Sequence, residues 1–136
     1  MANIYLLRRS FLAGLLILYV VQLGCLENQM NNNLSHAIFK QWIHSREEDT
    51  EGVRIYRPSD YNFPPSRGRE GFEIKENGEF IRYGIGPTDR RQKITGTWKV
   101  EENNKIRVTF EGQRQESYTI QILSCDEGVL KVSFDS

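Results

Sequence analysis

Neither sign of charge dominates this chain of 136 residues, which carries 18 Lys and Arg against 18 Asp and Glu. Nucleic-acid-binding proteins normally show an excess of basic residues, so the balance argues against a nucleic-acid partner. Cysteine and histidine are scarce, with two of each. The length and the hydrophobic content of 38% suit one domain with a modest core, and are too small for two domains.

Because these residue types are scarce, the sequence carries no enzymatic signature. His36 and His44 have no cysteine or carboxylate at metal-ligand spacing, so we expect neither a metal nor a cofactor. Ser124 and Ser133 lack a paired histidine. No helix follows Gly84-Ile85-Gly86 to complete a phosphate loop. We therefore expect a protein that is not an enzyme.

Residues 1–24 are interpreted as a secretory signal peptide. Arg8 and Arg9 precede the uncharged run FLAGLLILYVV, from Phe11 to Val21, and a small residue, Gly24, closes the segment. A basic start, an apolar middle and a small residue before the cut are typical of such signals. An uncleaved anchor helix is the alternative, but the run is shorter than the ~20 apolar residues of a membrane span.

Leu23-Gly24-Cys25 resembles the lipobox of bacterial lipoproteins. The resemblance implies that Cys25 is acylated and becomes the mature N-terminus, so that the chain is exported and anchored on the outer side of the cytoplasmic membrane or at the outer membrane. One acyl chain binds a membrane only marginally, so two or three are expected. Arg8 to Leu12 also resembles a twin-arginine export motif, but the greasy run that follows favours the Sec route.

Cys125 is the only other cysteine. If Cys25 is acylated, Cys125 has no intramolecular partner and is an inert thiol. If cleavage falls elsewhere, a Cys25–Cys125 disulfide can form in an oxidising compartment. Neither alternative makes Cys125 catalytic, because no base nearby would activate its thiolate.

The rest of the chain is predicted to be one all-β domain, residues 36–136, joined to the membrane by an Asn-rich flexible tether, residues 25–35. Ser35 is the expected N-cap of a short N-terminal helix. From Trp42 onward, hydrophobic residues alternate with a period of two, which is typical of strands. The eight predicted strands are Trp42–Glu48, Val53–Arg57, Gly71–Glu76, Glu79–Gly86, Gln92–Glu101, Lys105–Glu111, Glu116–Ser124 and Val129–Phe134.

Short connections predict that successive strands pair as hairpins. Asn77-Gly78 is the strongest turn signal and favours a type I′ turn. Only the segment from Pro58 to Glu70 has room for a crossover, and Pro64-Pro65 makes that segment a poor helix. We predict an antiparallel up-and-down meander closed into an eight-stranded barrel, since closure removes both free edges. A two-sheet sandwich is the alternative.

This succession of strands and short turns resembles that of the lipocalin-like domains of bacterial lipoproteins. The matching segments are Gly78-Glu79-Phe80, Gly96-Thr97-Trp98-Lys99-Val100, Tyr118-Thr119-Ile120, Leu130-Lys131-Val132 and Trp42 after the short helix. The resemblance covers roughly residues 36 to 134 and implies the lipocalin barrel without naming a ligand.

Large side chains at the inward positions favour a filled barrel over a sizeable cavity. Trp98, Phe110 and Phe134 are examples, whereas Gly84 and Gly96 are exceptions that either leave space or mark bends in the sheet. A meander also sorts its connections by end. We expect acidic connections, including Glu47 to Glu51, at one end and basic connections at the other.

The basic end supplies the candidate residues for binding a ligand or partner, which are Arg57, Arg67, Arg69, Arg90, Arg91, Tyr61 and Phe63. Arginine holds carboxylate or phosphate bidentately, and near a tether it also attracts anionic headgroups. A third interpretation is a solvated loop whose arginines pair locally with Asp60, Glu70 and Asp89.

These observations predict an exported, lipid-anchored, non-catalytic binding module of the cell envelope. Its partner besides the membrane is expected to be a small apolar or anionic ligand, or an envelope protein. The alternative is a protein–protein interaction device, such as an inhibitor or assembly factor, that acts through the Pro58–Glu70 loop. A cavity favours the first function, and a filled barrel with a rigid exposed loop favours the second.

Overall fold

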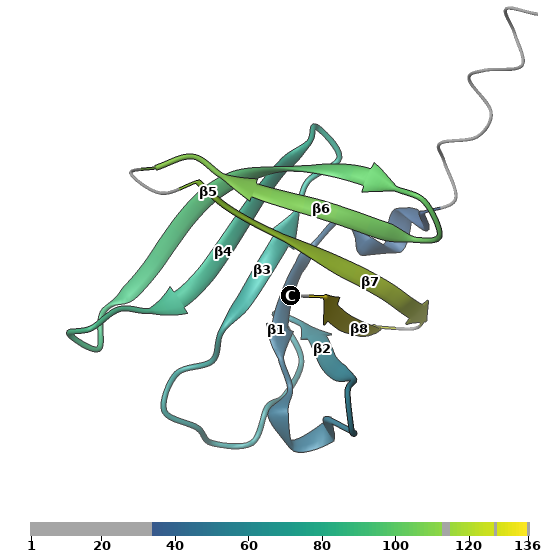
Figure 1. The fold of residues 1–136 in the computed structure, drawn as a ribbon. Coiled ribbons are helices and arrows are strands. Elements are labelled where there is room, and N and C mark those ends of the chain that lie inside the picture. Colours follow the sequence, from purple (N-terminus) through teal and green to yellow (C-terminus); the bar gives the residue numbers. More distant parts are fainter. Residues whose placement is uncertain (1–33, 113–114, 127, 136) are drawn as a thin grey trace, which may run out of the picture. The chain divides into compact units, whose positions relative to one another are not determined.

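The computed structural model describes residues 34–112, 115–126 and 128–135. Within them, eight antiparallel strands close into a barrel (Figure 1). The predicted all-β barrel is therefore confirmed, and the two-sheet alternative is excluded. The predicted signal segment and most of the predicted tether, residues 1–33, lie outside the described residues. No helix in the described part of the chain is long and apolar enough to cross a membrane.

Two short helical turns accompany the strands. The first, η1 (His36–Ile38), is a single 3₁₀ turn whose N-cap is Ser35, as predicted: the Ser35 side chain accepts a hydrogen bond from the amide of Ala37 at 3.2 Å. The second, η2 (Arg46–Glu48), follows the first strand. The strands are β1 (Gln41–His44), β2 (Arg54–Pro58), β3 (Gly71–Ile74), β4 (Glu79–Ile85), β5 (Arg91–Glu101), β6 (Lys105–Phe110), β7 (Glu116–Asp126) and β8 (Val129–Asp135).

The order of the strands differs from a simple meander at one place. From β3 to β8, each strand pairs with the next, as predicted. The second strand, however, does not pair with the third. Instead β1 lies between β2 and β3, and β2 closes the barrel on β8. Residues 59–70 therefore cross over β1. This is the connection that the sequence identifies as long enough for a crossover.

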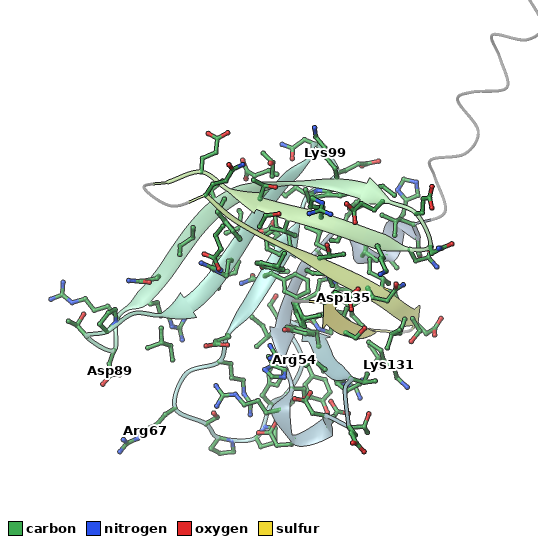
Figure 2. All side chains as sticks on the ribbon, in the orientation of Figure 1. Arg54, Arg67, Asp89, Lys99, Lys131 and Asp135 are labelled. Carbon is green, nitrogen blue, oxygen red and sulfur yellow. The ribbon has the colours of Figure 1, made fainter. Side chains whose placement is uncertain are left out.

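This order corrects the predicted separation of charges. The connection from β1 to β2 now shares an end with the β4–β5 and β6–β7 connections, which we call the open end. Glu47 and Glu48 therefore lie among the arginines and not with the other acidic turns. Figure 2 shows Arg67 and Asp89 at the open end and Lys99 toward the opposite, closed end.

Two tryptophans and η1 fill the closed end. Trp42 is fully buried, and its indole N–H donates to the carbonyl oxygen of Ile38 at 2.9 Å. Trp98 packs against Phe39, and its indole N–H donates to the carbonyl oxygen of Lys75 at 2.8 Å. Each indole thus has its hydrogen-bond partner, and this half of the barrel is a solid core.

The hairpin between β3 and β4 lies where Asn77-Gly78 predicts it, but its turn is of another type. Gly78 has a φ of +90°, whereas Asn77 keeps a negative φ. The amide of Gly78 donates to the carbonyl oxygen of Lys75 at 3.1 Å. A type I′ turn needs positive φ at both central residues, so the predicted type I′ turn is wrong: the connection runs from Lys75 to Gly78, with glycine at its left-handed position.

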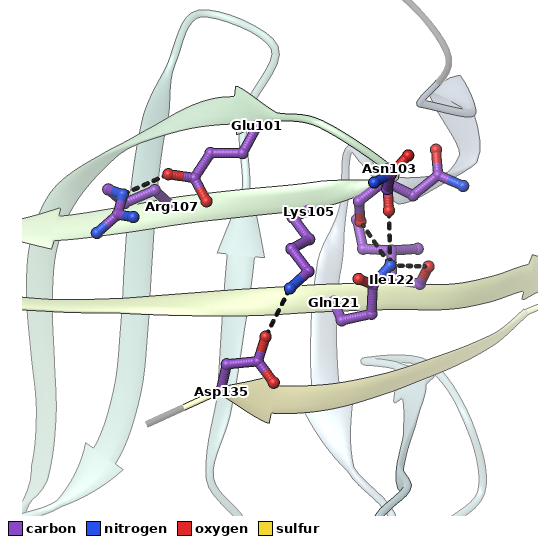
Figure 3. A network of polar contacts seen from close by, with 8 residues as sticks. Glu101, Asn103, Lys105, Arg107, Gln121, Ile122 and Asp135 are labelled. Atoms are coloured by element: carbon purple, nitrogen blue, oxygen red, sulfur yellow. Dashed lines mark hydrogen bonds and ion pairs between the residues drawn. The ribbon is translucent and has the colours of Figure 1, made fainter.

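Polar contacts join the outer faces of β5 to β8 (Figure 3). Lys105 on β6 pairs with Asp135 at the end of β8 at 2.8 Å, and Arg107 pairs with Glu101. The side-chain amide of Gln121 donates to the carbonyl oxygen of Asn103 at 2.8 Å. Exposed ion pairs contribute at most about 1 kcal/mol each, so the stability of the barrel depends mainly on its core.

Gly96 allows one of the closest contacts in that core. A methyl group placed on Gly96 would lie 2.4 Å from the carbonyl oxygen of Thr109 and 2.7 Å from the ring of Phe110. A methyl group on Gly84, in the neighbouring strand, would meet no atom within 4 Å.

Gly96→Ala is therefore expected to lower the free energy of unfolding by about 1–3 kcal/mol, because the added methyl must displace backbone or the buried ring. Gly84→Ala is the matched control and is expected to change it by less than about 0.5 kcal/mol. Urea denaturation of the two variants beside the wild type measures both values. Equal stability of the two variants would contradict this account of the Phe110 contact.

Candidate functional site: a pocket at the open end of the barrel

The open half of the barrel is not filled, so the predicted filled barrel is wrong for this half: its aromatic side chains line a space that they do not fill. A pocket of about 500 Å³, which we call the inner pocket, opens to solvent on one side. Its walls come from β2, β3, β4, β5, β7 and β8, so nearly the whole barrel contributes. The lining residues are Arg54, Tyr56, Glu70, Gly71, Phe72, Arg82, Tyr83, Gly84, Ile85, Gln92, Ile94, Tyr118 and Phe134.

Aromatic side chains form the base of the inner pocket. Tyr56 packs against Phe72 with ring centroids 4.7 Å apart, and Tyr118 lies 6.0 Å from Phe134. Burial raises the pKa of both Tyr56 and Tyr118 to about 12. Both hydroxyl groups therefore keep their protons at neutral pH and can donate hydrogen bonds to an acceptor in the pocket.

The side chain of Arg82 reaches from β4 across the inside of the barrel toward β7, next to these aromatic rings. Its guanidinium lies 4.5 Å above the ring of Phe110 and bonds both carboxylate oxygens of Glu116 on β7, at 2.8 and 3.2 Å. These hydrogen bonds lower the pKa of Glu116 and raise that of Arg82. The pair thus holds a guanidinium at the pocket, but one whose charge is already balanced.

Arg54 supplies the second guanidinium of the inner pocket. Arg54 lies on β2, the strand that closes the barrel on β8 (Figure 2). Its guanidinium is 4.8 Å above the ring of Phe134. Within residues 34–112, 115–126 and 128–135, no carboxylate forms an ion pair with it. Glu70 is the one acidic residue among those that line the pocket. An anion entering the pocket would therefore meet an exposed guanidinium beside aromatic rings and phenol hydroxyls.

Two of the predicted binding arginines are held elsewhere, by η2. Arg57 bonds both carboxylate oxygens of Glu48, at 2.5 and 2.8 Å, and Arg69 bonds both oxygens of Glu47, at 2.7 and 3.0 Å. The interpretation as locally paired arginines named the wrong acids: the partners are not Asp60, Glu70 or Asp89. Adjacent residues of η2 thereby fix the two ends of the crossover loop.

Tyr61 and Phe63 complete this arrangement inside the loop. Arg57 lies 4.8 Å from the Tyr61 ring, Arg69 lies 4.8 Å from the Phe63 ring, and the two rings meet edge to face at 4.9 Å. We call these six residues, Glu47, Glu48, Arg57, Tyr61, Phe63 and Arg69, the clamp. It orders a proline-containing loop that has no helix of its own.

The remaining predicted residues are dispersed. Arg67 points away from the ribbon (Figure 2), and Arg90 is exposed next to the β4–β5 turn. Arg91 lines a second pocket, of about 450 Å³, outside the barrel. None of the seven predicted residues lines the inner pocket. Cys25 lies outside the described residues, and Cys125 is a half-buried thiol whose pKa is raised by burial.

Sequence reasoning missed four residues that line the inner pocket together: Arg54, Tyr56, Arg82 and Tyr118. A usable signal existed, because Arg82 stands two residues after the buried Phe80, and Arg54 two before the buried Tyr56. Arginine at a position that alternation places inside a barrel is unusual, since such a charge is rarely buried without a partner.

Comparisons of the chain with protein-family models, with curated proteins and with solved structures find no match. The eight-stranded antiparallel barrel is consistent with a lipocalin-like fold.

The clamp gives the stability of the protein a specific dependence on pH. Hydrogen bonds from Arg69 and Arg57 lower the pKa values of Glu47 and Glu48, respectively, from 4.5 to about 2. The stabilisation is complete above pH 4.5 and is lost as the pH falls through 2. We expect the thermal unfolding midpoint of the wild type to fall more steeply between these pH values than that of a Glu47→Gln/Glu48→Gln variant. Parallel pH profiles would contradict the clamp.

Proposed function

We propose that this protein is a non-catalytic binding module that takes a small amphiphilic anion into the open end of its barrel. The observation that carries the proposal is the inner pocket, in which Arg54 and Arg82 stand over a base of aromatic rings. Its volume of about 500 Å³ falls in the ordinary range for small-molecule sites, and a few polar groups over an apolar base are typical of them.

The lining residues favour an anion with an apolar body. A carboxylate or sulfonate could accept hydrogen bonds from the Arg54 guanidinium and from the hydroxyls of Tyr56 and Tyr118. Hydrogen bonds to charged groups contribute about 1.5–3 kcal/mol each. The apolar body would lie against Phe72 and Phe134, where burial of its surface contributes about 25 cal/mol per Å². The resemblance to the lipocalin-like domains of bacterial lipoproteins supports the same use of the barrel.

We further propose that the module is exported and anchored to a membrane through acyl chains on Cys25. The basic and apolar start of the chain and the Leu23-Gly24-Cys25 motif support this localisation. The described domain begins at Leu34, which packs against the core near η1 at the closed end.

A protein partner at the crossover loop is the second candidate function. The clamp ties both ends of this loop to η2, and Arg67 projects from the loop toward solvent. A preorganised loop loses little conformational entropy on binding, which favours it as a recognition element. A partner recognised here would depend on Arg67, whereas an anion in the inner pocket would not.

The ligand proposal is tested with phenylbutyrate and its uncharged analogue phenylbutanol. Isothermal titration of the full chain in lipid nanodiscs, with empty nanodiscs as the baseline, is expected to show preference for the carboxylate. Arg54→Met should weaken phenylbutyrate binding by about 10- to 100-fold, corresponding to one charged hydrogen bond, and should leave phenylbutanol unaffected. Arg67→Met is the matched control. Equal losses in the two variants, or none in Arg54→Met, would refute the inner pocket as the site.

The proposed localisation is tested by measuring the intact mass of the protein isolated from native membranes and comparing it with that of a Cys25→Ser variant. A mass that begins at Cys25 and includes two or three acyl chains is expected for the wild type, and is expected to be absent in the variant. An unmodified soluble chain would refute the anchor and would make a Cys25–Cys125 disulfide the next species to test.

A further inference from the structure

The inner pocket has a neighbour on the outside of the barrel wall. This outer pocket, of about 450 Å³, lies between the crossover loop and the outer side of β1, β4 and β5. Ile43, Phe63 and Pro64 give it apolar walls, and one of its two arginines, Arg69, is already bonded to Glu47. Tyr83, Gly84 and Gln92 line both pockets. The two spaces therefore meet at the end of β4.

The strand register explains why the wall is thin at this point. The ladder between β3 and β4 ends at the pair Gly71–Tyr83, but β4 continues to Ile85 beside β5 alone. Two residues beyond Tyr83, Ile85 lies against the crossover loop: a methyl group on Gly68 would be 2.1 Å from the Ile85 Cδ1 atom. Between these two contacts stands Gly84, which has no side chain to close the space.

We propose that Gly84 marks a window through the barrel wall, and that the ligand is an elongated amphiphile whose chain passes through it. The anionic group would lie at Arg54 and Arg82 inside the barrel, and the apolar chain would continue over Gly84 into the outer pocket. This inference rests on the proposed function and specifies the ligand's shape: a linear chain longer than the inner pocket alone can hold.

The frame of the window limits what can cross it. The space open at Gly84 is that of one missing side chain, so we take the crossing part to be an unbranched chain, for which the outer pocket offers Ile43 and Phe63. Each methylene buried there strengthens binding about fourfold, because each buried methylene adds the same amount to the free energy of binding.

Gly84→Phe is the first test, because a ring fits at this position without backbone strain and stands where the two pockets meet. The probes are linear carboxylates of increasing length, from hexanoate to dodecanoate, titrated calorimetrically into the full chain in nanodiscs. Thr97→Phe, which adds the same ring at an exposed position of β5, is the matched control. Ile43→Glu changes the outer pocket alone.

In the wild type and in Thr97→Phe, affinity is expected to rise about fourfold per methylene up to the longest homologue. In Gly84→Phe and in Ile43→Glu, the rise should stop at an intermediate length, with hexanoate bound by Ile43→Glu as in the wild type. If both variants retain the full rise, the window is refuted while the inner pocket stands. If the wild type binds no homologue, the proposed function itself fails, and the window with it.

Discussion

The backbone hydrogen bonds that place β1 between β2 and β3 determine the whole open end of this barrel. A strand of only four residues is paired on both sides, so the chain must cross over it to begin β3. The crossover brings Arg69 to η2, where Arg57 of β2 is already bound, and starts β3 at Gly71, so that the β3–β4 ladder ends at Tyr83. The clamp, the two pockets and the end of β4 that pairs with β5 alone therefore share one cause.

The arginines of the open end fall into two physical classes. Those of the clamp have bidentate carboxylate partners and aromatic neighbours, and their work is to order the loop. Arg54 has an aromatic ring beneath it but makes no ion pair with the described residues. A neutral net charge conceals this difference, since what decides the chemistry of a cation is whether its own charge has a partner.

The sequence predicts the local features of this fold well, because they depend on near neighbours. Alternation from Trp42 onward locates all eight strands, and Asn77-Gly78 locates a hairpin. The order of β1 to β3 depends instead on pairing between distant residues, which alternation does not encode. The type of the hairpin turn was decided by Lys75 and Gly78, whose hydrogen bond closes the turn with Asn77 at negative φ. For the site, charge counting favoured Arg57 and Arg69, whereas the inner pocket contains arginines at inward positions of strands.

The pairing of Arg82 with Glu116 has a consequence for how tightly any anion is held. Glu116 is a carboxylate tethered within reach of one of the two guanidiniums of the inner pocket, so it competes with every ligand for that group. The free energy of binding at Arg82 is then the difference between two similar ion pairs, not the full strength of one. Under the proposed function, such a site would release its anion readily, which would suit transient loading and exchange more than permanent sequestration.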